Sequence, residues 1–283
     1  MSDSIFLAEG ESFVPTDHAR GPWDPKALHG GAPAALMTTA FERLEPGGDL
    51  LIARLGFEFL RPIPFAPLSI SVRIVRPGRR VQELAGELRN GEELIARASA
   101  LRVQRIPDGL PGVAPRLQAR AGSPSLPEPA SEDSSEASPD GPMPGPDAGE
   151  RVRFALDDAG RTSFAASAME MRWLDDPAQL GPARVWMRLR HPLLADEPLT
   201  PLARLAATAD FGNGVSAVLP FERFLFINAD LTIHLQRAPL GEWIGLDART
   251  LLRDGGMGLA ESVLHDVHGP VGRAFQTLVV QPR

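Results

Sequence analysis

Residues 209–243 have the sequence A-D-F-G-N-G-V-S-A-V-L-P-F-E-R-F-L-F-I-N-A-D-L-T-I-H-L-Q-R-A-P-L-G-E-W, and this stretch decides the fold. Apolar and polar residues alternate strictly from Ile227 to Gln236, which predicts one strand with an apolar face and a polar face. The polar face would carry Asn228, Asp230, Thr232, His234 and Gln236. A solvated face of an antiparallel sheet explains these residues as well as a functional site does. Asp210 favours a site, because this carboxylate follows an apolar segment and stands beside a Gly-Asn-Gly turn.

Composition limits the class of protein. The chain has 283 residues, enough for one large domain or two of ordinary size. It has no cysteine, which excludes disulfides, thiolate zinc sites and a cysteine nucleophile. The first residues lack the basic and apolar pattern of a secretory signal, and no run approaches the length of an apolar membrane span. We therefore expect a cytoplasmic protein without a membrane partner.

The negative net charge comes from one segment. Residues 123–150 contain seven acidic residues, seven prolines and no Lys or Arg, which leaves 29 acidic and 29 basic residues elsewhere. A neutral remainder argues against a nucleic-acid partner. The segment has too few apolar residues to offset the entropy cost of ordering, so it predicts a mobile linker. The expected organisation is an N-terminal repeat at 1–110, a linker at 111–150 and a C-terminal repeat at 151–283.

The two halves repeat one pattern of predicted elements. The first half has a helix over 29–44, followed by strands over 51–60, 68–75, 81–89 and 93–103. The second half has a helix over 199–209, followed by strands over 225–236, 243–252, 258–266 and 272–280. Before the helices, we expect further strands at 9–14, 164–173 and 184–190. One helix followed by four antiparallel strands, twice, predicts an α+β fold in which each repeat wraps a sheet around a long helix.

This duplicated arrangement resembles the double-hotdog acyl-CoA thioesterases of the acyl-CoA thioesterase II group. The likeness covers nearly the whole chain outside 123–150, and its motifs are H-G-G at 29–31, R-A-P-L-G-E-W at 237–243 and G-R-A-F-Q at 272–276. The resemblance implies a tandem hotdog fold and an enzyme of lipid metabolism that hydrolyses an acyl-CoA thioester. It also implies an active site in the C-terminal repeat and a homodimer of double hotdogs as a further assembly.

The resemblance also assigns the groups that orient the attacking water. In the family these are an Asp, a Ser or Thr, and a Gln of the second repeat, which fall here on Asp210, Asn228 and Gln276. Asn228 departs from the family because it has no hydroxyl, and Thr232 on the same predicted face is the alternative hydroxyl. The chemistry fits, since a carboxylate can accept a proton from water and carboxamides can orient it. Equally, Asp210 suits a helix cap and Gln276 suits an edge or solvent-facing position.

His29, Gly30 and Gly31 open the first predicted helix, and we expect them to bind substrate. Glycine lets a ligand approach the backbone closely, and the free N–H groups of a helix N-terminus can stabilise a developing oxyanion. A tight entry into a packed helix explains the two glycines nearly as well. His29 fits a structural or rim position better than it fits a base.

The first repeat lacks its own set of site residues. Residues 36–40, two turns into its helix, include no acid. Aligning the halves places Ala100 at the position of Gln276 and Ile52 at that of Asn228. We therefore expect one active site per chain.

The sequence contains no motif typical of metal-dependent, nucleotide-dependent or serine-hydrolase chemistry. The six histidines show no metal-binding spacing, and we predict neither a metal nor a cofactor. A phosphate-binding loop and the G-x-S-x-G nucleophile motif are also absent from the sequence. Two alternatives to the thioesterase remain. One is an acyl-thioester-binding protein without turnover, and the other is a hotdog hydratase or dehydratase, for which His234 would have to approach Asp210.

Overall fold

The structure is a computed structural model, and it describes residues 3–22, 24, 26–44, 48–106, 143–152, 162–253 and 255–283. The N-terminal repeat contains β1 (Phe6–Glu9), β2 (Ser12–Pro15), η1 (Asp17–Ala19), α1 (Gly31–Arg43), β3 (Leu50–Phe59), β4 (Leu68–Arg76), β5 (Val81–Asn90) and β6 (Glu93–Gln104). The C-terminal repeat contains η2 (Pro146–Ala148), η3 (Phe164–Ala168), β7 (Met169–Trp173), β8 (Ala183–Leu189), α3 (Pro201–Ala209), α4 (Gly212–Val215), β9 (Phe224–Asn228), β10 (Asp230–Leu235), β11 (Ile244–Leu252), β12 (Met257–Asp266) and β13 (Gly269–Pro282). Within these residues no helix has the length and apolarity needed to span a bilayer.

One antiparallel sheet runs through both repeats. Its strand order is β1-β2-β4-β5-β6-β3-β10-β13-β12-β11-β8-β7, and β9 pairs with the end of β13. The order is symmetric about the junction of β3 with β10, where Asp230 pairs with Glu58 and His234 with Arg54. Each strand of one repeat therefore has a counterpart in the other, which confirms the predicted duplication.

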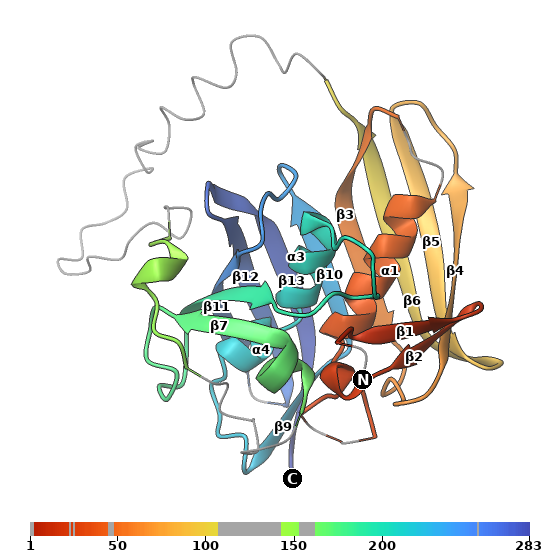
Figure 1. The fold of residues 1–283 in the computed structure, drawn as a ribbon. Helices are drawn as coiled ribbons and strands as arrows, with labels where there is room; N and C mark the ends of the chain where they lie inside the picture. The colour runs from red at the N-terminus through yellow and green to blue at the C-terminus, as the bar shows by residue number, and fades with distance from the viewer. Residues whose placement is uncertain are drawn as a thin grey trace.

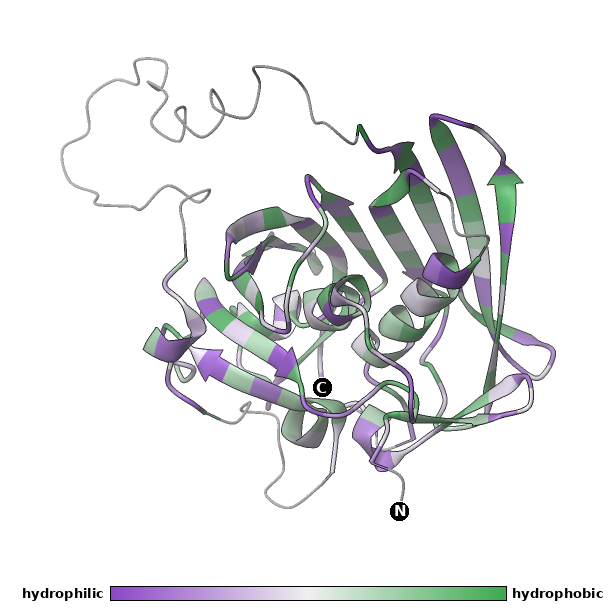
Figure 2. Cartoon of the chain, turned by 45° about the horizontal axis from the view of Figure 1, so that its top comes forward, coloured by the Kyte–Doolittle hydropathy of each residue, from purple (hydrophilic) through white to green (hydrophobic). Residues whose placement is uncertain are grey.

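The helices α1 and α3 lie side by side against the sheet (Figure 1). They are antiparallel, because the start of α1 at Gly31 lies beside Ala207 at the end of α3, while Glu42 near the end of α1 contacts Thr200 at the start of α3. Both helices are rich in small residues that are fully buried, namely Ala32, Ala34, Ala35, Ala203, Ala206, Ala207 and Ala209. Alternating apolar and polar bands along the strands show how the sheet supplies the other side of the core (Figure 2).

The predicted strand over 225–236 is broken, and this is the main correction to the sequence-based fold. In β9, Asn228 pairs with Leu278, whereas in β10 Thr232 pairs with Phe275, so the register against β13 slips by one residue. At the break, the N–H of Thr277 donates to Oδ1 of Asp230 at 2.6 Å. A slip of one residue exchanges the two faces of a strand. Phe226 is accordingly buried before the break, and Leu231 and Ile233 are buried after it.

Three smaller predictions also change. The strand expected at 9–14 is a hairpin of β1 and β2, which turns at Gly10 with a φ of +63°. The strand expected from Phe164 begins as the π-helical turn η3, and only β7 is extended. The linker prediction for 111–142 falls outside the described residues, but 143–150 contradict it by packing on the C-terminal repeat. There Trp186 donates from Nε1 to the carbonyl of Pro144 at 2.6 Å.

Arg237 of the R-A-P-L-G-E-W motif pairs with the buried Asp266, and this pair is called the clamp below. Arg237 donates to both carboxylate oxygens of Asp266, at 2.5 and 2.6 Å, and also to the carbonyls of Gly269 and Pro270. The backbone N–H groups of His268 and Leu240 donate to the same carboxylate. Burial alone would raise the pKa of Asp266, but these hydrogen bonds outweigh burial and lower it. The motif therefore fixes the turn after β10 against the turn between β12 and β13.

The substitution Asp266→Asn should reduce the free energy of unfolding at pH 7 by about 3 kcal/mol, because it leaves Arg237 without its buried partner. A carboxyl group with a lowered pKa stabilises the fold above its unfolded pKa of 3.8, and this contribution is lost as the pH falls through the folded value. Urea unfolding should therefore show a smaller difference between the two proteins at pH 3 than at pH 7. Glu261→Gln, which breaks a more exposed pair with Arg249, is the control and should cost less than about 1 kcal/mol. Equal losses in both variants would contradict a special role for the clamp.

Candidate active site

The carboxylate of Asp210 lies where the two repeats meet. Asp210 caps the C-terminus of α3 with a φ of −70° and a ψ of −10°, and it is 4% exposed. It faces Gly30, the residue that caps the N-terminus of α1, so closely that a Cβ on Gly30 would lie 2.8 Å from Oδ2. The site therefore requires glycine at position 30.

Two side chains hold the Asp210 carboxylate. Asn228 donates from Nδ2 to Oδ1 at 2.8 Å, and Nδ1 of His29 lies 3.0 Å from Oδ2. His29 comes from the N-terminal repeat and Asn228 from the C-terminal repeat. The carboxylate consequently links both repeats, and the structure brings four of the predicted site residues together, namely Asp210, Asn228, His29 and Gly30.

The ring of His29 is fixed by aromatic neighbours. It stacks on Phe211 with a centroid distance of 4.2 Å and lies 5.1 Å from the ring of Phe164. Its Nδ1 also accepts a hydrogen bond from the N–H of Gly31 at 3.1 Å. The two polar contacts compete for one atom, because Gly31 requires a lone pair on Nδ1 and Asp210 requires a hydrogen there. Whether Nδ1 carries a hydrogen therefore decides which of the two groups the ring of His29 binds.

A cavity of about 460 Å³ opens onto this cluster. Its polar lining includes Asp210, Asn228, His29 and Gly30. Apolar residues of both repeats form most of its remaining wall, namely Pro22, Ala27, Leu28, Phe59, Pro62, Ile63, Leu225, Ile227 and Ala229. A cavity that combines an apolar wall with a few convergent polar groups is typical of a small-molecule site. Arg61, whose guanidinium pairs with Glu93, and Asp24 also line the cavity.

Gln276 lies behind this cluster and does not line the cavity. Its Nε2 donates to the backbone carbonyl of Asp210 at 3.1 Å, and its Oε1 accepts from the N–H of Asn213 at 2.9 Å. The side chain is 1% exposed. Both ends of the carboxamide therefore bind the backbone of the turn between α3 and α4, so Gln276 holds the residue that carries the carboxylate.

Thr232 lies away from the site, so the prediction that it shares a face with Asn228 was wrong. The register slip after Asn228 turns Asn228 inward with Phe226, whereas beyond the break the inward positions are Leu231 and Ile233. Thr232 then points to the opposite face, between its strand neighbours Gly56 and Phe275.

The sequence analysis missed two kinds of site residue. Phe211 and Phe164 hold the ring of His29, and Asn213 contacts Gln276. A signal for Phe211 was present, since it follows Asp210 directly. Phe164 has no such signal, because its contact with His29 joins residues 135 positions apart.

Comparison with known proteins decides the family. A model of the acyl-CoA thioesterase N-terminal domain matches residues 19–103, and a model of the acyl-CoA thioesterase C-terminal domain matches residues 133–280. The chain belongs to the acyl-CoA thioesterase family. It is accordingly a thioester hydrolase, and the H-G-G segment and Asp210 fall one in each of the two matched domains.

Solved structures confirm the double-hotdog fold of this thioesterase. An acyl-CoA thioesterase II from Mycobacterium marinum is 18% identical with a TM-score of 0.62, over 97% of this chain and 94% of the other. A hotdog protein from Alicyclobacillus acidocaldarius is 19% identical with a TM-score of 0.64, over 98% and 95%. A protein described as a thioesterase II from Thermobifida fusca is 15% identical with a TM-score of 0.69, over 99% and 96%. No curated protein matches the sequence significantly.

The substitution Gly30→Ala should lower thioester hydrolysis about 100-fold, because the new Cβ displaces the Asp210 carboxylate and small displacements of reacting groups are costly. The fold should persist, since Gly30 has a helical φ of −58° that alanine adopts readily. The matched control is Gly145→Ala, whose Cβ would meet nothing within 4 Å. Acyl-CoA hydrolysis is measured for both, and equal activity would contradict the steric requirement at position 30.

Proposed function

We propose that this thioesterase hydrolyses an acyl-CoA to the free acid and coenzyme A in the cavity between its repeats. The observation that carries the proposal is the position of Asp210. Its carboxylate is almost fully buried, is held by Asn228 and His29, and lines an apolar cavity at the N-terminus of α1. The acyl chain would lie along the apolar wall of the cavity, and the coenzyme A moiety would lie at its mouth.

Asp210 acts as the base that activates water. A water bound to its carboxylate attacks the thioester carbonyl carbon, and Asp210 accepts the proton as the new C–O bond forms. The C–S bond then breaks, and the departing thiolate of coenzyme A takes up a proton. Asn228 keeps the carboxylate in place through its Nδ2, and its Oδ1 is an acceptor that can orient the water.

The start of α1 stabilises the oxyanion. Among the described residues, the N–H of Gly30 has no hydrogen-bond partner, and it lies at the N-terminus of a 13-residue helix that lines the cavity. Such an amide favours negative charge on a nearby oxygen. When Nδ1 of His29 carries a hydrogen and donates it to Asp210, the N–H of Gly31 is released and becomes a second donor to the same oxygen.

Asp210→Asn should reduce kcat for acyl-CoA hydrolysis at least about 1,000-fold, because the amide accepts no proton from water. Binding of a non-hydrolysable acyl-CoA thioether should persist, which separates loss of the base from loss of the site. The control is Glu9→Gln, an exposed carboxylate on β1 outside the cavity. Medium and long acyl-CoA substrates are assayed by thiol release. Unchanged turnover in Asp210→Asn would rule out this mechanism.

Asn228→Ala should lower kcat about 10- to 100-fold by removing the donor to Asp210, whereas Asn228→Ser restores the hydroxyl of the family and should keep more activity. Circular dichroism and thermal unfolding of both variants verify that the fold is retained. A serine variant no better than alanine would show that a donor at this position does not support catalysis.

The pairing of His29 with Asp210 also favours a second candidate, a hotdog hydratase. That alternative needs a paired His and Asp, and the structure supplies His29 in place of the expected His234. The same enzyme preparation is incubated with an enoyl-CoA, and loss of the double bond is followed alongside thiol release. Hydration without hydrolysis would support the second candidate, and saturable binding without either reaction would indicate a binding protein.

A further inference from the structure

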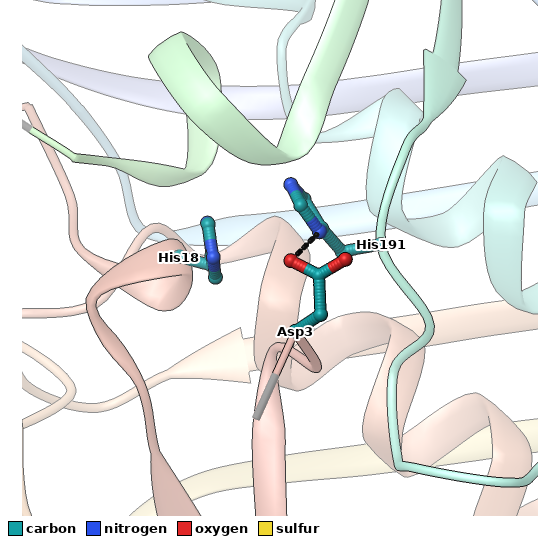
Figure 3. A group of neighbouring side chains, drawn as sticks. All are labelled: Asp3, His18 and His191. Carbon is teal, nitrogen blue, oxygen red and sulfur yellow. Dashed lines mark ion pairs between the residues drawn. The ribbon is translucent and has the colours of Figure 1, made fainter. Parts of the chain in front are cut away.

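Three side chains outside the cavity form a cluster with metal-ligand chemistry. Asp3 precedes β1, His18 lies in η1, and His191 follows β8. Their ligand atoms lie within 4.8 Å of one another, and Figure 3 shows the three side chains gathered around one space. The rings of His18 and His191 are stacked at 4.1 Å. Sequence spacing gave no sign of this cluster, because its members come from both repeats.

Backbone hydrogen bonds hold the three segments together. The N–H of Ile5 donates to the carbonyl of Pro192 at 2.9 Å, which ties the segment of Asp3 to that of His191. Thr16 donates from its hydroxyl to the carbonyl of Ser4 at 2.7 Å, which ties the segment of His18 to the first. The cluster is therefore built on fixed backbone and does not rest on long flexible side chains alone.

The tautomer of His18 leaves one nitrogen free to bind a metal. The hydroxyl of Ser167 donates its hydrogen to the carbonyl of Ser163 at 2.6 Å, so it can only accept from Nδ1 of His18, 2.8 Å away. In the neutral ring this places the hydrogen on Nδ1 and the lone pair on Nε2. A histidine that donates its second nitrogen to a fixed oxygen is the usual arrangement at metal sites.

His191 contributes a buried nitrogen, Nδ1, that makes no hydrogen bond among the described residues. Oδ1 of Asp3 nevertheless lies only 2.9 Å away. The contact is short, but its direction does not fit an N–H donor. A cation between the nitrogen and the carboxylate would satisfy both. Asp3 can adjust to such an ion, since its side chain is 82% exposed.

We propose that Asp3, His18 and His191 bind one divalent transition-metal ion, with Nε2 of His18, Nδ1 of His191 and the Asp3 carboxylate as ligands. Two imidazoles and one carboxylate suit zinc, iron or nickel. Ligands about 2.0 to 2.2 Å from one tetrahedral ion lie about 3.4 Å from one another. Separations of up to 4.8 Å in the cluster must therefore shorten, and the 2.9 Å between Nδ1 of His191 and Oδ1 of Asp3 must widen slightly. Rotation of Asp3 and small ring movements supply both changes.

The ion would join the two repeats next to the active site. His18 precedes Ala19, whose carbonyl accepts the backbone N–H of His29 at 3.0 Å. The N–H of Phe164 donates to the carbonyl of Arg20, so the same segment also places the ring that contacts His29. The site is a structural clip that fixes the position of His29, and it is separate from the cavity that contains Asp210.

Zinc binding to the full chain tests the proposal. The protein, prepared without an affinity tag and treated with a chelator, is titrated with Zn²⁺ by calorimetry, and Co²⁺ absorption reports the ligand environment. We expect one ion per chain and a rise in Tm with Zn²⁺. His18→Gln, His191→Gln and Asp3→Asn should each weaken binding at least about 100-fold. Ser167→Ala, which removes only the partner of His18, should weaken it about 10- to 100-fold.

The matched control is His234→Gln, an exposed histidine on β10 that should leave Zn²⁺ affinity unchanged. Asp3→Asn is the ligand variant that should fold normally, because this exposed side chain can change without disturbing the core. Weaker binding in this variant would therefore not result from misfolding. The proposal is overturned if the parent protein binds no Zn²⁺ with one-to-one stoichiometry. It is also overturned if the folded ligand variants bind as tightly as His234→Gln. Neither readout depends on thioesterase activity.

Discussion

The close antiparallel packing of α1 against α3 is the constraint on which the structure depends. Small residues let the two helix backbones approach, and at Gly31 even a Cβ would collide with the carbonyl oxygen of Ala207. This approach brings the positive end of one helix to the C-terminal end of the other, where Asp210 is placed. The carboxylate of Asp210 and the N-cap residue of α1, Gly30, thereby line one cavity. Neither repeat alone contains both groups.

At the opposite end of the contact between α1 and α3, the end of α1 meets the start of α3. The side chains there differ from those around Asp210, so the two repeats are not equivalent. There Thr200 donates to Glu42 at 2.6 Å, and burial raises the pKa of Glu42. Arg102 binds the carbonyls of Phe41 and Leu44 at the end of α1, much as Gln276 binds the carbonyl of Asp210. Each repeat thus uses a buried side chain of equivalent strands, β6 and β13, to hold the end of its helix. Glu42 and Arg102 line a cavity of their own, of about 440 Å³, but the carboxylate with an amide partner is that of Asp210 in the second repeat.

Local sequence patterns predicted the helices and strands well, but they did not predict the side-chain contacts between segments far apart in the sequence. The helix expected at 29–44 is α1 at Gly31–Arg43, and the strand expected at 93–103 is β6 at Glu93–Gln104, because periodicity is a property of neighbouring residues. The family resemblance supplied Asp210 and Asn228, which do meet. The contact of His29 with Asp210 joins positions 181 residues apart, and only the packing of the two helices determines it. The Asp3, His18 and His191 cluster escaped sequence analysis for the same reason.

The break at Ala229 shows why alternation alone misplaced the polar face. The pattern of apolar and polar residues continues through the break, so the sequence is consistent with either face, and the pairing with β13 decides between them. Because of the slip, Asn228 turns inward while Thr232 turns away. A carboxamide at this position reaches the carboxylate with a donor, as a hydroxyl would, and adds an acceptor of its own. The carboxamide therefore holds the Asp210 carboxylate through its Nδ2, and in the mechanism that we propose its Oδ1 is the group that orients the water.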